Sequence, residues 1–277
     1  MNKKLFVFDM DGTLLNSKRT INKATVDILN KAMAQGHDVV FATGRNFCQI
    51  TDELKLFPKI KYAITINGGI INDVVNKKID ILSQPLDQKV IQEIVRIAQS
   101  LKRELQWSNE RNFYRVYFGN DPYKEVDDPN FFSASKLPIY DDWEQYKHTL
   151  ESDIVLHIAI KCEKKYVLEH IPPLREKFEK KQMCTITETS KNYLDCDPLN
   201  INKYNAVKKI QALLGYDNEN TYAFGDSNND YLMIKHVGNG VAMGNARDEL
   251  KAIAKHVIGD NDSCAIANFV EEVINHD

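Results

Sequence analysis

A short apolar run that ends at two acidic residues constrains the fold more than any other stretch of this sequence. Residues 5–8 read Leu-Phe-Val-Phe and lead directly into Asp9-Met10-Asp11-Gly12. A continuous apolar run bounded by a turn signal is typical of a strand buried on both faces. Ligands of open α/β sheets bind beyond the carboxyl ends of the strands. The tripeptide alone fits a plain β-turn equally well, but a divalent cation would explain two adjacent carboxylates at such an edge.

The alternation of buried strand, polar turn and helix continues through the first 82 residues. Residues 38–42 and 62–66 read as further strands, and helical spacing of apolar residues predicts helices over 20–36 and 46–56. This alternation predicts a doubly wound parallel sheet. The two later strands end in Thr43-Gly44-Arg45 and Asn67-Gly68-Gly69. Polar residues and glycine from three strands should therefore meet at one edge of the sheet.

A different pattern over residues 83–196 predicts a second domain. A long helix over 86–105 precedes an aromatic hairpin with arms at 106–108 and 113–118, and residues 121–138 read as a polar, irregular connection. Helices at 143–150 and 165–181, a strand at 154–160 and a last hairpin over 183–196 follow. Pro172 and Pro173 favour a break or a late start of the second of these helices. We expect an inserted α+β domain at 83–196.

The first pattern returns near the C-terminus. The sequence predicts a helix over 202–214 and a buried strand over 221–224 that ends in Gly225-Asp226-Ser227-Asn228-Asn229-Asp230. A further strand within 236–243, a short one at 257–258 and a helix over 264–274 complete the chain. Residues 1–82 and 197–277 should therefore form one Rossmann-like α/β core, in which four strand ends carry polar residues.

Composition excludes several classes of function. The net charge of −3 over 277 residues gives no basic field for nucleic acid or an anionic membrane. No apolar stretch approaches the ~20 residues of a transmembrane helix. The five cysteines are scattered and odd in number, which favours reduced thiols in a cytoplasmic protein over a zinc site or a disulfide framework. The sequence gives no indication of the oligomeric state.

The string Asp9-Met10-Asp11-Gly12-Thr13-Leu14 resembles the nucleophile motif of the haloacid dehalogenase superfamily, Asp-x-Asp-Gly-Thr-Leu/Val. The order of the later motifs, and a long α+β insertion between the second and third, resemble the Cof-type branch of capped phosphatases, with a cap of type C2. This resemblance implies that Asp9 is the nucleophile that becomes an aspartyl-phosphate, and that Asp11 is the general acid and base. It also implies that Mg²⁺ is held by Asp9, Asp226 and the backbone carbonyl of Asp11.

The resemblance implies roles for residues on the other strand ends. Asn67 and Asp230 would support the site, whereas a phosphate-binding role falls to four residues: Gly12, Thr43, Gly44 and Asn229. Taken alone, Thr43 fits a simple helix N-cap better, and residues 225–230 also fit a turn rich in Asp and Asn. Arg45 is expected to pair with a surface acid, outside the catalytic set.

Lys203 occupies the position that resembles the catalytic lysine of the superfamily. It begins a predicted helix, where a cation is poorly placed against the helix dipole unless a phosphate or carboxylate offsets it. The family usually has glycine three residues before and one residue after this lysine, where this chain has Asn200 and Tyr204. Asn tolerates the left-handed conformation, whereas Tyr204 would add bulk near the phosphate.

The residues and the resemblance together predict a Mg²⁺-dependent phosphomonoester hydrolase of a small phosphorylated metabolite, such as a sugar phosphate. A phosphomutase similar to phosphomannomutases and a non-catalytic sugar-phosphate-binding regulator are the alternatives. The cap would select the substrate and exclude water. Its candidate contacts are Trp107 and the segments 109–112 and 188–192, although packing in the core of the cap is the stronger interpretation of Trp107.

Overall fold

The computed structural model describes residues 2–119, 142–189 and 193–275. They divide into two compact units, one formed by Met1–Leu82 with Asn202–Asp277 and the other by Ser83–Ile201. The first unit corresponds to an α/β fold and the second to an α+β fold, so the predicted fold class is confirmed. No helix in the described ranges combines the length and the apolar character that crossing a bilayer requires.

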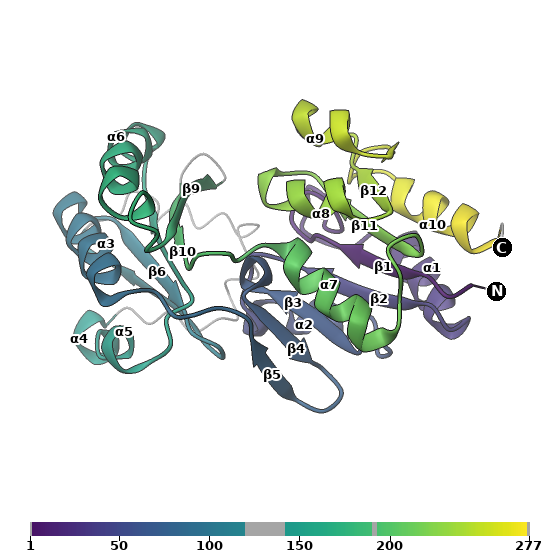
Figure 1. The fold of residues 1–277 in the computed structure, drawn as a ribbon, viewed down its shortest axis with the longest axis horizontal. Coiled ribbons are helices and arrows are strands. Elements are labelled where there is room, and N and C mark those ends of the chain that lie inside the picture. The colour runs from purple at the N-terminus through teal and green to yellow at the C-terminus, as the bar shows by residue number, and fades with distance from the viewer. Residues whose placement is uncertain (1, 120–141, 190–192, 276–277) are drawn as a thin grey trace. The chain divides into compact units, whose positions relative to one another are not determined.

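A mixed sheet of eight strands, counted over the described residues, forms the centre of the first unit in the order β13-β12-β11-β1-β2-β3-β4-β5. Pairing is parallel from β13 to β3, and β4 and β5 add an antiparallel edge. The strands are β1 (Leu5–Phe8), β2 (Asp38–Ala42), β3 (Tyr62–Thr65), β4 (Ile70–Asp73), β5 (Lys78–Ile81), β11 (Thr221–Gly225), β12 (Asn239–Ala242) and β13 (His256–Val257). Figure 1 shows β1 between β2 and β11, so the two ends of the chain build one sheet.

Helices from both ends of the chain cover this sheet. They are α1 (Lys23–Ala34), α2 (Thr51–Leu54), α7 (Lys203–Leu214), α8 (Tyr231–His236), α9 (Asp248–Ile253) and α10 (Ala265–Asn275). Helix α1 packs against α10 and α7 packs against α8. Asn22 caps α1 by accepting a hydrogen bond from the backbone N–H of Ala24 at 2.9 Å.

Two local expectations for this unit were incomplete. The predicted helix over 46–56 is a 3₁₀ turn at Phe47–Gln49 followed by the short α2, because Ile50 leaves the helical conformation between them. Strands β4 and β5 were not predicted. Residues in β5 are half-buried or exposed, so this edge strand carries no continuous apolar run.

An antiparallel sheet of five strands within the described ranges forms the second unit, in the order β7-β6-β8-β10-β9. The strands are β6 (Glu104–Ser108), β7 (Phe113–Tyr117), β8 (His157–Lys161), β9 (Thr185–Thr189) and β10 (Tyr193–Asp197), and the helices are α3 (Gln88–Leu101), α4 (Trp143–Tyr146), α5 (Thr149–Ser152) and α6 (Lys164–Leu174). Pro172 and Pro173 lie inside α6, and a π-helical turn over Arg175–Glu179 follows directly. The chain therefore stays helical across the two prolines, contrary to the expected break.

Trp107 belongs to the apolar core of this second unit. Its side chain is fully buried, its ring stacks on Tyr114 with centroids 5.0 Å apart, and its indole N–H donates to Thr149 Oγ1 at 2.9 Å. Asn109 is also buried and accepts hydrogen bonds from the backbone of Arg111 and Asn112, so it fixes its own turn. The predicted connection at 121–138 and the segment 190–192 lie outside the described residues.

Candidate active site

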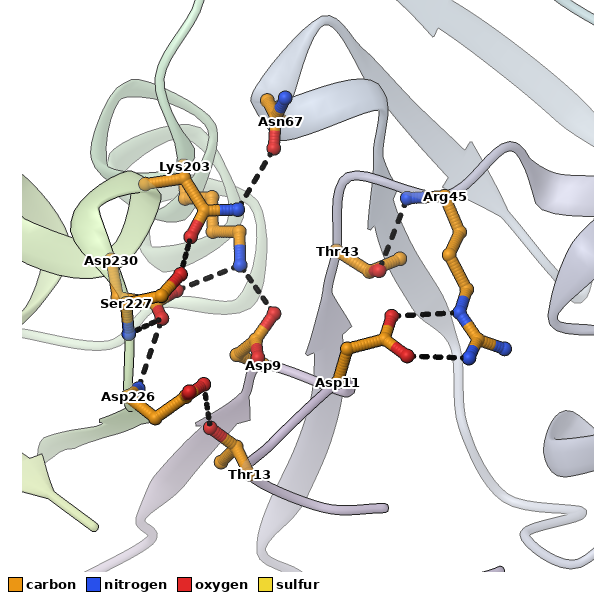
Figure 2. A network of polar contacts seen from close by, with 11 residues as sticks. Asp9, Asp11, Thr13, Thr43, Arg45, Asn67, Lys203, Asp226, Ser227 and Asp230 are labelled. Carbon is orange, nitrogen blue, oxygen red and sulfur yellow. Dashed lines mark hydrogen bonds and ion pairs between the residues drawn. The ribbon is translucent and has the colours of Figure 1, made fainter. Parts of the chain in front are cut away.

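Pairing of β1 with β11 brings the first acidic motif next to the last one. The backbone N–H of Asp9 donates to the carbonyl of Phe224 at 3.0 Å, which fixes the end of β1 against the end of β11. Asp226 follows β11 immediately, although it lies 217 positions after Asp9 in the sequence. The two carboxylates therefore share one edge of the sheet, as the parallel topology predicts (Figure 2).

Lys203 lies fully buried between two carboxylates. Its Nζ donates to Asp9 Oδ1 at 2.5 Å and to Asp230 Oδ1 at 2.7 Å. Burial alone would lower the pKa of Lys203, but the charges of Asp230 and Asp9 outweigh it, and the pKa lies above its usual value. Burial and the charge of Asp230 raise the pKa of Asp9 well above its usual value, despite the opposing charge of Lys203. The lysine is therefore a permanent cation that holds one oxygen of Asp9.

Two backbone features place Lys203 at this point. Asn202 caps α7 by accepting from the backbone N–H of Asn205 at 2.9 Å, so Lys203 is the first helical residue. Gly68, at φ 99°, lies against this cap so closely that a Cβ there would stand 2.3 Å from the carbonyl oxygen of Asn202. Asn200 adopts the left-handed conformation at φ 63°, which an Asn in the place of the usual Gly tolerates. The ring centroids of Tyr204 and His236 lie 5.1 Å apart.

Asp230 organises the loop that carries Asp226. One of its oxygens binds Lys203, and the other accepts from the backbone N–H of Asp226 at 3.0 Å and of Ser227 at 3.1 Å. Gly225 permits this approach, since a Cβ there would stand 2.5 Å from Cβ of Asp230. The loop is therefore built around one fully buried carboxylate rather than being a plain solvent-exposed turn.

Three carboxylates at this edge have the geometry to hold a cation. Asp9, Asp226 and Asp230 each offer one carboxylate oxygen, and these three oxygens lie within 4.8 Å of one another. Burial and the charge of Asp230 raise the pKa of Asp226 to about 6. A hard divalent cation would reduce the repulsion between carboxylates crowded in this way, and carboxylate oxygens are ligands that Mg²⁺ prefers. The donor set therefore fits Mg²⁺.

Gly12 and Thr13 shape the approach to Asp226. Gly12 has φ 80°, and a Cβ there would stand 2.5 Å from Asp226 Oδ2. Thr13 Oγ1 donates to Asp226 Oδ1 at 3.1 Å. Thr13 lies inside the first motif, but no role was predicted for its side chain. Only glycine fits at position 12, because both the space and the backbone conformation exclude a side chain.

The carboxylate of Asp11 is turned away from this cluster and toward Arg45, as Figure 2 shows. Arg45 Nε donates to Asp11 Oδ2 at 2.8 Å and Nη2 donates to Oδ1 at 2.6 Å. Desolvation alone would raise the pKa of Asp11, but the charge and hydrogen bonds of Arg45 hold it below its usual value. Arg45 was expected to pair with a surface acid, and the half-exposed carboxylate that it binds is Asp11 of the first motif.

The candidate phosphate-binding residues line the adjacent strand ends. Thr43 is buried, and its Oγ1 accepts from the backbone N–H of Arg45 at 3.1 Å, which leaves the hydroxyl proton for another acceptor. The alternative interpretation of Thr43 as a helix N-cap is wrong, because Asn46 caps the following turn. Asn67 Oδ1 accepts from Asn229 Nδ2 at 3.1 Å. A Cβ on Gly44 would stand 2.9 Å from Asn67 Oδ1.

Comparison with known proteins identifies the family. The sequence model of the haloacid dehalogenase-like hydrolase family matches residues 6–270 of this chain. The chain is 29% identical over 280 residues to the 5-amino-6-(5-phospho-D-ribitylamino)uracil phosphatase YcsE of Bacillus subtilis, with 99% of this chain and 95% of that protein covered. It is 26% identical over 285 residues to the pyridoxal phosphate phosphatase YbhA of Escherichia coli, with 98% of each covered. A solved haloacid dehalogenase-like hydrolase from Bacteroides thetaiotaomicron has a TM-score of 0.82 at 24% identity, covering 98% of this chain and 100% of that one.

The chain belongs to the haloacid dehalogenase-like hydrolase family. Relatives that match over nearly its whole length are named phosphatases, and the chain is accordingly an enzyme of the phosphoric monoester hydrolase class. The resemblance that the first motif suggested is confirmed by the family match.

Proposed function

We propose that this enzyme is a Mg²⁺-dependent phosphatase of a small phosphorylated metabolite, such as a sugar phosphate, and that it works through an aspartyl-phosphate on Asp9. The observation that carries the proposal is the fully buried Lys203 between Asp9 and Asp230. A lysine fixed in this way favours the ionised form of Asp9 against the effect of burial, fixes the orientation of its carboxylate, and adds positive charge where a phosphoryl group needs it. The relatives named above support a small phosphorylated substrate.

The proposed chemistry has two steps on this chain. A carboxylate oxygen of Asp9 attacks phosphorus, the ester P–O bond breaks, and the leaving oxygen takes a proton from Asp11. Asp11 then takes a proton from water, whose oxygen attacks the same phosphorus; the bond to Asp9 breaks and inorganic phosphate leaves. Thr43 and Asn229 would bind the phosphoryl oxygens. When bound by Asp9, Asp226 and the backbone carbonyl of Asp11, Mg²⁺ would supply neutralising charge to those oxygens.

The second unit is proposed to act as the cap that selects the substrate. We propose that the cap comprises residues 83–196 and that the catalytic core comprises residues 1–82 and 197–277. The second compact unit of the structure, Ser83–Ile201, begins at the same residue and ends five residues later. Trp107 and Asn109 belong to the packing of this unit, which leaves other residues to contact the leaving group. The five free thiols support a cytoplasmic location.

The test is phosphate release by the purified enzyme from a panel of phosphorylated metabolites, with Mg²⁺ and with a chelator. We expect release that requires Mg²⁺ and that is lost in Asp9→Asn, but kept in Asp27→Asn, a matched change on the exposed face of α1. Full turnover of p-nitrophenyl phosphate by Asp9→Asn would refute the proposed nucleophile. Interconversion of hexose monophosphates with negligible phosphate release would instead identify a phosphomutase.

A further inference from the structure

Arg45 is a firmly anchored cation that binds the proposed acid–base residue directly. Its side chain is 6% exposed, whereas the side chain of Asp11 is 52% exposed. The backbone of Arg45 is held on both sides: its N–H donates to Thr43 Oγ1 at 3.1 Å, and its carbonyl accepts from Ile66 N–H at 3.0 Å. In this pair the arginine is the fixed partner and the aspartate is the side chain that it holds.

A second carboxylate keeps the guanidinium in place. Glu53 of α2 lies with Oε1 3.6 Å from Arg45 Nη1, on an edge that the bonds to Asp11 do not use. Arg45 therefore presents its Nε and Nη2 edge to Asp11 in a planar, two-point contact. Such a fork fixes both the position and the plane of a carboxylate, which a single hydrogen bond does not.

Asp11 has a particular need for such a partner. It is separated by one residue from Asp9 and lies beside the acidic cluster that includes Asp226 and Asp230. A half-exposed aspartate on a loop next to three carboxylates would otherwise populate several rotamers. Figure 2 shows Asp9 directed toward Lys203 and Asp11 toward Arg45, so two cations give the two neighbouring carboxylates separate orientations.

We propose that Arg45 is the positioning residue for the acid–base carboxylate: it fixes the orientation from which Asp11 serves the leaving group. This inference rests on the proposed function, because it takes Asp11 to be the proton donor. Arg45 itself touches no reacting atom in this role. The strand-end sequence Thr43-Gly44-Arg45 thereby contributes to proton transfer as well as to phosphate binding.

The test compares kcat/KM for two phosphomonoesters, because only a poor leaving group needs a proton when its bond to phosphorus breaks. p-Nitrophenyl phosphate releases a stable phenolate, whereas an alkyl phosphate such as glycerol phosphate releases an alkoxide unless it is protonated. General acid catalysis contributes about 10²–10⁴-fold. We expect Arg45→Met to lower kcat/KM for the alkyl ester by up to about 10²-fold and by less than Asp11→Asn does, because the acid stays and loses only its fixed orientation, and to lower it for the aryl ester far less.

Three further variants make the result decisive. Asp11→Asn should shift the alkyl-to-aryl ratio in the same direction, and Arg45→Lys should fall in between, since an ammonium keeps the charge but not the fork. Arg103→Met is the matched control, because it breaks another two-point contact, with Glu163 at 2.9 and 2.7 Å, and should leave the ratio unchanged. Thermal unfolding of each variant shows whether it is folded.

An equal loss toward both esters in Arg45→Met, with the ratio shifted in Asp11→Asn, would overturn the positioning role and leave the proposed function standing. An unchanged ratio in Asp11→Asn would overturn both the positioning role and the assignment of Asp11. Loss of all turnover in Asp9→Asn is the separate check that the phosphatase mechanism itself holds.

Discussion

Replacing Lys203 with methionine tests the electrostatic centre of the site. The change keeps an unbranched side chain in a position that is fully buried, but it removes the cation that contacts Asp9 at 2.5 Å and Asp230 at 2.7 Å. Both carboxylates remain buried, at 4% and 0% exposure. Removing one partner of a buried ion pair costs about 3–5 kcal/mol, because the other charge is left uncompensated.

This magnitude is large enough to measure by thermal unfolding. For a domain of about 150–250 residues, each kcal/mol lowers Tm by roughly 2–4 °C, so we expect a decrease of roughly 6–20 °C in the absence of Mg²⁺. Lys209→Met is the matched control on the same helix, since Lys209 pairs with Asp80 at 2.6 Å but is 45% exposed. Loss of an exposed pair costs less than about 1 kcal/mol.

The pH dependence has a defined sign. Without Lys203, the carboxyl pKa of Asp9 rises further, because the charge that opposes its rise is lost. A carboxyl whose pKa is higher in the folded state destabilises that state above its unfolded pKa. The stability deficit of Lys203→Met should therefore shrink as the pH falls from about 8 toward about 5. A Tm within the range of the Lys209→Met control, or a deficit that grows toward acid pH, would refute this reasoning.

Three other changes should have equally specific results. Gly12→Ala puts a Cβ 2.5 Å from Asp226 Oδ2 at a backbone φ of 80°. Calorimetric titration should therefore show weaker Mg²⁺ binding than in the control Gly215→Ala, where φ is 75° but the space is open. Equal Mg²⁺ binding by the two variants would contradict this prediction. Asp226→Asn removes one proposed ligand and should abolish the rise in Tm that Mg²⁺ gives the parent enzyme, whereas an undiminished rise would exclude Asp226 as a ligand. In the second unit, burial would lower the pKa of His157, but Asp197 at 2.8 Å and Asp195 at 3.5 Å outweigh it and raise the pKa to about 9. His157→Gln should therefore cost up to about 3 kcal/mol below pH ~6.5 and nothing above pH ~9, measured by urea unfolding; a loss that is flat with pH would contradict the ion pair.

The core sheet was predictable because its central strands are buried on both faces. Four consecutive apolar residues at 5–8 and the run at 38–42 need no tertiary information to be recognised as strands, and the structure places both as predicted. Strands β4 and β5 are different. Strand β4 pairs with β3, from Tyr62 opposite Asp73 to Thr65 opposite Ile70, and β5 pairs with β4. These pairings give β5 its strand structure although exposed residues interrupt its short sequence.

The convergence of Asp9, Lys203 and Asp226 was anticipated from motifs at strand ends and from a family resemblance. Arg45 was not, because a fork to Asp11 across 34 positions depends on the register between β1 and β2 and on the direction of a long side chain. Neither the register of the two strands nor the direction of the arginine side chain can be derived from the spacing of residues along the sequence. Thr43 illustrates the same limit, since local propensity favours Thr43 as an N-cap, whereas the 3₁₀ turn begins at Phe47 and Asn46 is its N-cap.

The most direct measurement of the proposed mechanism is to trap the enzyme during turnover. The enzyme is mixed with an excess of substrate and Mg²⁺, quenched in acid within milliseconds, and digested for mass spectrometry. We predict one phosphoryl group on the peptide that contains Asp9, and none in Asp9→Asn. A phosphoryl group on another residue, or rapid turnover with no phosphorylated peptide at any quench time, would contradict the role of Asp9 as the nucleophile.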